Sequence, residues 1–143
     1  MFEKIRKMKN KNGFTLVELI VVLVILAILA ALLVPALTGY IDKARKQSII
    51  AETRQCVMAA QTIVSEKYGA TEGDVANADI DVAKVTGLAE VKGEVSGITI
   101  GKAGDSKYNG KVMTLTYTKT NGSTTYTCTY NAEPTNGEQY SVS

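Results

Sequence analysis

The sequence predicts an α+β protein in which a long, kinked N-terminal helix packs its C-terminal half on a small antiparallel sheet. Three observations lead to this fold class. An apolar segment fills residues 14–37, an amphipathic helical pattern follows over residues 38–69, and two alternating segments nearer the C-terminus flank an Asn-Gly pair. Helical periodicity followed by strand periodicity is typical of α+β folds. We therefore divide the chain into residues 1–13, 14–37, 38–69 and 70–143.

The segment 14–37 is long and apolar enough to cross a membrane. Only Thr15, Glu18 and Pro35 interrupt its apolar character. As a helix at 1.5 Å per residue it would extend roughly 36 Å, against about 30 Å for the hydrocarbon core of a bilayer. Pro35 removes a backbone hydrogen bond and is expected to kink the helix. The five basic residues before the segment favour a cytoplasmic position for the start of the chain.

Beyond Gly39 the pattern of a helix continues. Apolar and small side chains recur every three or four residues and form one stripe: Ile49, Thr53, Cys56, Val57, Ala60, Ile63 and Val64. This periodicity predicts an amphipathic helix whose stripe packs against the core of a domain. Gly69 is a candidate stop signal, so we expect one helix over residues 14–68.

Residues 70–110 have the composition of a loop-rich connector with two short elements. We expect a short helix over residues 79–88 and a short strand over residues 95–100.

Residues 111–118 and 124–130 alternate apolar and polar side chains, with Asn121-Gly122 between them. Asn-Gly is favoured in type I′ hairpin turns, because both central residues need positive φ. Centring the turn on this pair gives the expected partners on the apolar face: Tyr117 with Tyr126, Leu115 with Cys128, and Met113 with Tyr130. The other face of the hairpin then carries a ladder of threonines.

The two cysteines fall on surfaces that both need a partner. Cys56 lies on the stripe of the helix and Cys128 on the apolar face of the hairpin. The simplest arrangement packs these surfaces together, and a Cys56–Cys128 disulfide would then link helix to sheet in a small exported domain. A disulfide between these two positions would stabilise the folded state by about 4–5 kcal/mol in the chain-entropy description, because it closes a long loop of the unfolded chain. The alternative is that both cysteines stay reduced and act as small apolar core residues.

Composition argues against catalysis, metal binding and a nucleic-acid surface. The chain has no His and no Trp, and its two cysteines match neither a CxxC pair nor a zinc cluster. No nucleophile–base pair can be proposed, so we expect no enzyme activity, no cofactor and no metal site. The first 13 residues hold five of the 16 basic and one of the 14 acidic residues. Without them 11 bases face 13 acids, so nucleic-acid binding has no support from charge.

A carboxylate at the start of a membrane-spanning segment needs an explanation. An acidic side chain costs roughly 2.5–3.5 kcal/mol at the centre of a membrane helix, and an unpaired charge in apolar surroundings is unfavourable. Glu18 follows Gly13, Phe14, Thr15 and Leu16, and this junction closely resembles the processing site of type IV prepilins. That family has a short basic leader ending in Gly, then an aromatic residue, Thr-Leu, and Glu at the fifth position after the cut.

The resemblance implies a pilin fold and specific roles for the junction. Residues 1–13 would be a leader that prepilin peptidase removes after Gly13, with N-methylation of Phe14. Cleavage creates an ammonium group on Phe14, one helical turn from Glu18. That cation, from the same chain or from the next subunit, is the partner that the carboxylate needs, and pairing between subunits would favour one axial register. In pilins a proline at the position of Pro35 accompanies local melting of the helix in the assembled fibre.

A simpler interpretation of the N-terminal segment is a secretory signal peptide cut after Val34-Pro35-Ala36, or an uncut signal anchor. A basic start and an apolar run satisfy both interpretations. Neither accounts for Glu18, because an ordinary signal peptide is apolar at that place.

The resemblance implies a structural subunit of a type IV pilus, a homopolymer held together by its N-terminal helices. The subunit would wait in the cytoplasmic (inner) membrane until an assembly ATPase and a platform protein move it into an extracellular fibre. Attachment, twitching motility, aggregation and DNA uptake are the outputs that the family offers.

Other functions stay open at this level. A minor pilin would carry the same junction. So would a pseudopilin of a type II secretion or competence system, although the major secretion pseudopilin has a calcium-binding C-terminal loop whose ligand spacing this sequence lacks. A membrane-tethered binding module differs in class, but no recognition motif identifies what it would bind.

Overall fold

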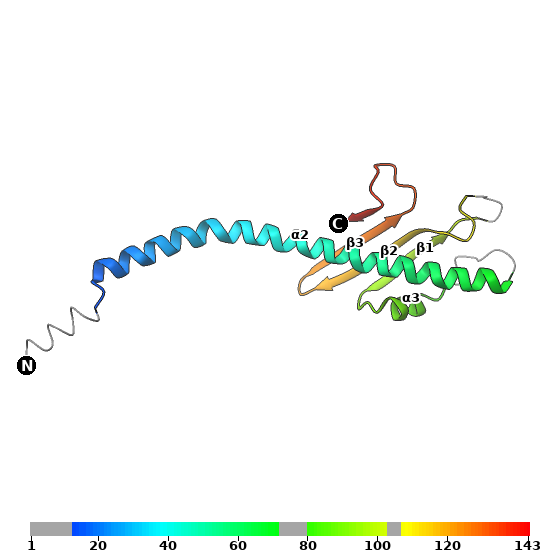
Figure 1. Ribbon diagram of the computed structural model, residues 1–143, viewed down its shortest axis with the longest axis horizontal. Coiled ribbons are helices and arrows are strands. Elements are labelled where there is room, and N and C mark those ends of the chain that lie inside the picture. Colours follow the sequence, from blue (N-terminus) through cyan, green and yellow to red (C-terminus); the bar gives the residue numbers. More distant parts are fainter. Residues whose placement is uncertain (1–12, 72–79, 103–106) are drawn as a thin grey trace, which may run out of the picture. The chain divides into compact units, whose positions relative to one another are not determined.

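A computed structural model describes residues 13–71, 80–102 and 107–143 of the chain (Figure 1). The expected leader therefore lies outside the described residues, except for Gly13. The structure divides into two compact units, Met1–Asp42 and Lys43–Ser143, which are considered separately. Helix α2, Leu16–Thr71, contributes to both units, and the other described elements belong to the second.

In the first unit, α2 is an apolar helix that none of the described residues covers. The side chains of residues 16–42 are all exposed. An 18-residue window of the helix has a mean hydropathy of 3.3 and none of it is buried. By length and composition this helix is able to cross a membrane, as predicted.

Pro35 lies inside α2 without ending it. Its ring nitrogen has no hydrogen to donate to the carbonyl of Ala31, one turn earlier. The hydroxyl of Thr38 donates to the Pro35 carbonyl at 2.9 Å, which adds a side-chain hydrogen bond in the turn after the proline. The proline therefore weakens the helix locally but leaves it helical on both sides.

The second unit combines the remainder of α2 with a helix and, among the described residues, four strands. These are α3 Val82–Ala89, β1 Glu94–Ile100, β2 Val112–Asn121, β3 Thr124–Asn131 and β4 Tyr140–Val142. The strands form one antiparallel sheet in the order β1-β2-β3-β4. Figure 1 shows the later part of α2 lying across the sheet, with α3 beside it. The predicted α+β fold class is confirmed, and the arrangement is consistent with a pilin fold.

The core of the second unit forms where the stripe of α2 meets the sheet. Six of the seven predicted stripe residues are buried, and Val57 is half-buried. The sheet contributes four buried side chains from the predicted apolar face: Leu115, Tyr117, Tyr126 and Cys128. Removing apolar surface from water, at about 25 cal/mol per Å², is the main force that holds this helix to the sheet.

The hairpin turn lies one residue later than predicted. Asn121 pairs with Thr124, so Gly122 and Ser123 are the central residues of the turn. Of these two only Gly122 has positive φ, at 64°. Positive φ at the first central residue alone is the pattern of a type II′ turn, in which Gly is preferred there, and not of the predicted type I′ turn.

Because the turn moves by one residue, each predicted cross-strand partner was wrong by two positions along the strand. The observed pairs on the apolar face are Tyr117 with Cys128, Leu115 with Tyr130, and Lys119 with Tyr126. A shift of two residues leaves each side chain on its predicted face, because side chains alternate with period two. The apolar face and the threonine ladder are therefore both present, and Thr120 and Thr125 hydroxyls lie 3.0 Å apart across the strands.

The ends of several elements differ from the prediction. Helix α2 continues through Gly69, which does not adopt the positive φ of a C-terminal capping glycine. Helix α3 begins after Asp81, whose carboxylate accepts a hydrogen bond from the Ala83 N–H at 3.0 Å; residue 79, its expected start, lies outside the described residues. Strand β4 was not predicted, because three residues are too few to display a period.

Candidate processing and assembly site

The junction before helix α2 is exposed and non-helical. Gly13, Phe14 and Thr15 precede the first helical residue, Leu16. The side chain of Phe14 is 86% exposed. Exposed, irregular backbone is where proteases preferentially cut. The Gly13–Phe14 peptide bond, the predicted cleavage site, is therefore accessible in this structure.

Thr15 and Glu18 form a capping box at the start of α2. The Glu18 N–H donates to Thr15 Oγ1 at 3.2 Å, and the Thr15 N–H donates to Glu18 Oε2 at 3.0 Å. The first backbone bond of the helix runs from the Leu19 N–H to the Thr15 carbonyl at 3.1 Å. Thr15 is thus the N-cap and Glu18 the third helical residue. The box satisfies two backbone donors that the helix itself leaves without a partner.

The capping box supplies a local role for Glu18 that was not predicted. The carboxylate lies at the N-terminal end of the helix dipole, where negative charge is favoured. The Thr-x-x-Glu spacing ahead of an apolar run was the signal available for this box. The Phe14 ammonium arises only after cleavage, so its ion pair with Glu18 stays a prediction.

Glu18 is exposed, and its neighbours on this surface are apolar side chains. It lines a groove along α2 together with Phe14, Val17, Val21 and Val22. Where lipid or another helix covers this surface, an ionised carboxylate favours contact with a cation or a hydrogen-bond donor. This end of α2 therefore presents one polar group on an otherwise apolar face.

A second polar cluster, which no sequence pattern predicted, joins α2 to the sheet. Glu52 Oε2 accepts a hydrogen bond from the Tyr117 hydroxyl at 2.5 Å, and Glu52 Oε1 accepts one from Lys119 Nζ at 2.6 Å. The Tyr117 oxygen also accepts from the Gly93 N–H at 3.0 Å. Burial, and then the hydrogen bond to Glu52, raise the pKa of Tyr117, so its hydroxyl stays protonated and donates. This cluster fixes how the helix sits on the sheet.

The structure contains Cys56 and Cys128 as free thiols, and both are fully buried. They lie on the two predicted surfaces, which pack into one core. Burial, and then the nearby charge of Glu52, raise the pKa of Cys56 from 9.0 to about 11. Burial likewise raises the pKa of Cys128, against a lowering by its hydrogen bond with Thr53. Burial therefore disfavours the thiolate form of both cysteines in this reduced structure, and the disulfide stays a prediction.

The chemistry of the junction suits processing and packing. Within residues 13–71, 80–102 and 107–143, no group of three or more His, Cys, Asp or Glu side chains is placed to hold a metal ion. What the junction offers is an accessible peptide bond, an exposed aromatic residue and a capped carboxylate. These groups are suited to being cut, modified and packed against another helix.

Comparison with known proteins agrees with this view of the N-terminus. Residues 8–34 match the family described as the prokaryotic N-terminal methylation motif. This motif is the class III signal peptide of type IV pilins, so the chain carries a pilin-type signal. No solved structure matches the chain. The resemblance predicted from the junction is confirmed by this match.

The match supports a type IV pilin-like protein or a pseudopilin. The proteins that carry this motif are structural and not enzymatic. The motif implies processing by prepilin peptidase and assembly into a pilus. Together with the apolar helix, it fits anchoring in a membrane followed by assembly.

Proposed function

We propose that this chain is the subunit of a type IV pilus and polymerises through its N-terminal helices. The observation that carries the proposal is the junction itself, where an accessible Gly13–Phe14 bond precedes a capped carboxylate and an uncovered apolar helix. Such a helix needs lipid or other apolar helices around it, because its surface is unfavourable in water. A membrane before assembly and a bundle of copies afterwards supply both environments.

Processing prepares the N-terminus for that bundle. In this proposal prepilin peptidase cuts after Gly13 and methylates the new amino group of Phe14. The cut also removes five basic residues that favour the cytoplasmic side of the membrane. The new ammonium lies one residue before the capping box, within reach of Glu18 in the same chain or in a neighbour.

The charge pair gives the bundle its register. Apolar helices slide past one another at little cost, whereas a carboxylate in apolar surroundings is stabilised only at the position where it meets a cation. Pairing Glu18 with the Phe14 ammonium of the next subunit selects that position. Pro35, which lacks one backbone hydrogen bond, lets the helix adjust locally during packing.

Assembly needs an external energy source in this scheme. Exchanging lipid contacts for helix contacts gains little hydrophobic free energy. An assembly ATPase and a platform protein therefore extract the subunit from the cytoplasmic (inner) membrane into an extracellular pilus. The pilus then serves attachment, twitching motility, aggregation or DNA uptake. A minor pilin or a pseudopilin of a type II secretion or competence system is the second candidate, because the matched motif is common to these proteins.

Mass spectrometry of the exported protein tests the processing step. We expect a mature N-terminus at Phe14 that carries one methyl group on its amine. A terminus at Leu37 would instead identify an ordinary signal peptide and contradict the proposal.

A pair of substitutions separates the two roles of Glu18 in assembly. Glu18→Gln keeps an acceptor for the capping box but removes the charge, and Glu18→Ala removes both. We expect cleavage of both variants and few filaments from either, counted by electron microscopy with antibody to residues 70–143. Glu66→Ala, which removes an exposed carboxylate from the second unit, is the control. Normal filament numbers from Glu18→Gln would rule out the charge pair.

A further inference from the structure

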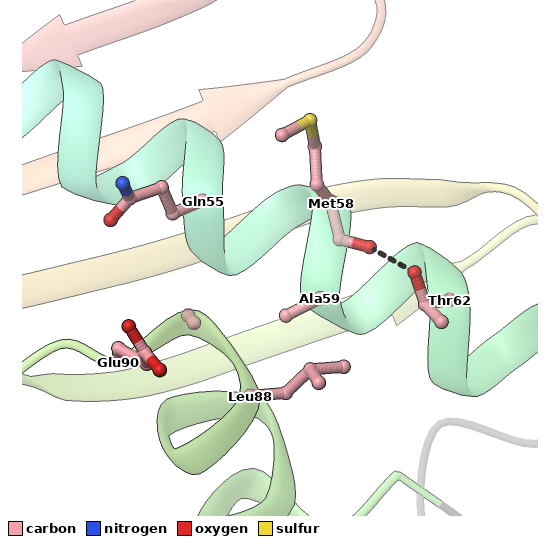
Figure 2. A pocket seen from close by; sticks show the side chains of 7 residues that line it. Gln55, Met58, Ala59, Thr62, Leu88 and Glu90 are labelled. Carbon is pink, nitrogen blue, oxygen red and sulfur yellow. Dashed lines mark hydrogen bonds between the residues drawn. The ribbon is translucent and has the colours of Figure 1, made fainter.

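The groove between α2 and α3 and the loop between β3 and β4 both lie outside the proposed function. In Figure 2 Leu88 reaches from α3 toward Ala59 of α2, whereas the Met58 side chain points away from α3. The Thr62 hydroxyl donates to the Met58 carbonyl at 2.9 Å, so it is already satisfied within α2. The residues that line the groove therefore do not select a partner. The loop, residues 132–139, has reactive chemistry of its own.

The loop contains an Asn-Gly pair, the dipeptide in which an asparagine side chain is most easily converted to a carboxylate. In this reaction the backbone nitrogen of the next residue attacks Asn Cγ, and Gly has no side chain to hinder the approach. The described part of the chain contains three such pairs: Asn109-Gly110, Asn121-Gly122 and Asn136-Gly137. Because each Asn is followed by Gly, the dipeptide alone does not distinguish them, and the fold must decide which one reacts.

Two of the pairs are held by their surroundings. Asn121 is half-buried and pairs with Thr124 at the end of β2. Asn109 is half-buried too, and the Gly110 carbonyl accepts a hydrogen bond from Gln61 Nε2 at 2.8 Å. The attack requires the backbone to rotate, which in these pairs would break contacts that open only by local unfolding. The fold therefore protects Asn109 and Asn121.

Asn136 and Gly137 are both exposed and belong to no helix or strand. Among the described residues, no group accepts a hydrogen bond from the Gly137 N–H, whose nitrogen is the attacking atom. A side-chain carbon added at Gly137 would meet no atom of a described residue within 4 Å, so the loop has room to rearrange. The contacts that hold the other two pairs have no counterpart in this part of the structure.

A turn of the backbone also prepares the Asn136 side chain for attack. Its Oδ1 accepts a hydrogen bond from the Glu138 N–H at 3.1 Å, which folds the side chain back along the loop in an Asx turn. When the Gly137 nitrogen adds to Cγ, negative charge develops on Oδ1. A donor already aimed at that oxygen stabilises the charge as it forms. The Glu138 N–H thus favours the reaction at Asn136.

We propose that Asn136 is a site of spontaneous deamidation, with water as the co-reactant. The Gly137 nitrogen gives its proton to solvent and forms a bond to Asn136 Cγ. The Cγ–Nδ2 bond then breaks, and Nδ2 takes a proton from solvent and leaves as ammonia, so a succinimide ring remains. Water opens the ring at either of its carbonyl carbons, which gives aspartate or isoaspartate without oxidation or reduction. Either product adds one negative charge to the loop at neutral pH.

Ageing the exported protein in detergent micelles at mildly alkaline pH tests the site. Peptide mapping by tandem mass spectrometry measures the deamidated fraction of Asn109, Asn121 and Asn136 over time. We expect Asn136 to react several-fold faster than the other two. In urea, where the fold is lost, the three rates should converge, so the chain supplies its own control. Equal rates in the folded protein, or a preference for Asn136 that persists undiminished in urea, would overturn the inference.

Glu138→Pro tests the Asx turn, because proline lacks the N–H that donates to Asn136 Oδ1. Deamidation of Asn136 in the folded protein should slow several-fold. Glu138→Gln removes the same charge but keeps the N–H, and should leave the rate unchanged. Residue 138 is exposed, so both variants should keep the melting temperature of the unmodified protein. Equal deamidation rates for the two variants would overturn the inference that the turn selects Asn136.

Isoelectric focusing follows the added charge in the intact protein. The aged protein should develop a more acidic band, and Asn136→Gln should lack it, because the longer side chain would have to close a larger ring. Asn121→Gln is the matched control in the hairpin and should develop the band as the unmodified protein does. An acidic band of unchanged strength in Asn136→Gln would overturn the inference. These measurements need no filaments, so their outcome is independent of the proposed function.

Discussion

Thr15 and Glu18 satisfy each other's backbone N–H groups at the first turn of α2, over distances of 3.2 and 3.0 Å. The carboxylate of Glu18, the charge at the start of the apolar segment, therefore accepts a hydrogen bond from its own chain. This arrangement holds the carboxylate at the helix end, beside the residue that cleavage turns into the N-terminus. The capping box and the proposed ion pair are compatible, because a carboxylate can accept more than one hydrogen bond.

Thr15→Val tests the capping box, because it removes the hydroxyl but keeps the branched shape. We expect the first turn to lose about 1 kcal/mol of local stability. Amide hydrogen exchange of the processed protein in detergent micelles should then be roughly fivefold faster at Glu18. Thr15→Ser keeps the hydroxyl and should exchange at the original rate. Equal rates for the Val and Ser variants would show that the hydroxyl does not cap the helix.

Glu52→Ala tests the polar cluster between α2 and β2. The change leaves the buried Tyr117 hydroxyl and the Lys119 ammonium without their common acceptor, so we expect a loss of roughly 2–3 kcal/mol in the free energy of unfolding. Urea unfolding followed by circular dichroism measures it. Glu66→Ala, an exposed carboxylate of the same helix, should change stability by less than about 0.5 kcal/mol. Similar effects of the two substitutions would refute a special role for Glu52.

Gln61→Leu tests a hydrogen-bonded link from α2 to the start of β2. Gln61 Nε2 donates to the Gly110 carbonyl at 2.8 Å, and Gln61 Oε1 accepts from the Val112 N–H at 2.9 Å. Leu leaves both backbone groups unpaired, so thermal unfolding should reveal a loss of about 2 kcal/mol. Gln47→Leu, at an exposed position of α2, is the matched control and should be close to neutral. A neutral Gln61→Leu would mean that water replaces the side chain at no cost.

The raised pKa of Cys56 makes the reduced protein sensitive to alkali. Its pKa in the folded state, about 11, is above the ordinary value of 9.0, so the folded state holds the proton more tightly. The resulting stability is complete below pH 9 and is lost as the pH rises toward 11, by roughly 2–3 kcal/mol in total. The melting temperature of the reduced protein should fall between pH 8 and pH 11. The melting temperature of the Cys56→Ala variant should fall less over the same range. Parallel curves for the two proteins would contradict this cause.

The link between Cys56 and Cys128 is testable in the exported protein. Peptide mapping without reducing agent should recover the two cysteine peptides as one linked species, because both thiols lie in the core that joins helix to sheet. Alkylation in denaturant before digestion distinguishes the disulfide from free thiols, because only free thiols are alkylated. Alkylated Cys56 and Cys128 would establish that the exported protein keeps the free thiols of this structure.

The elements predicted well from the sequence are those with a long repeated pattern. The apolar helix and the stripe of α2 extend over many turns, so one misplaced residue does not change the interpretation. The threonine ladder and the apolar face of the hairpin were predicted equally well, from the alternation of apolar and polar side chains. The fold class and the location of both cysteines in the core followed from these patterns.

The hairpin register illustrates what a pattern cannot decide. Shifting one strand by two residues keeps each side chain on its face, so polarity does not distinguish Tyr117 opposite Tyr126 from Tyr117 opposite Cys128. The difference depends on whether Gly122 takes the first or the second central place of the turn. That choice follows from backbone geometry, which the Asn-Gly pair alone did not reveal.

Features made by tertiary contact were not available from the sequence at all. The cluster around Glu52 joins it to Tyr117 and Lys119, which lie 65 and 67 positions further along the chain. The capping box is the exception, because its Thr-x-x-Glu spacing is visible in the sequence ahead of the apolar segment.

The turn at Gly122 and Ser123 offers a practical use of the fold. Both residues are exposed, and a side-chain carbon added at Gly122 would meet no atom within 4 Å. The paired strands on either side hold the ends of the turn together, so a short peptide inserted there is expected to leave the sheet intact. In a filament built from this chain, one insertion would be repeated in each subunit, and the turn would become a scaffold for displaying epitopes or binding peptides at high density.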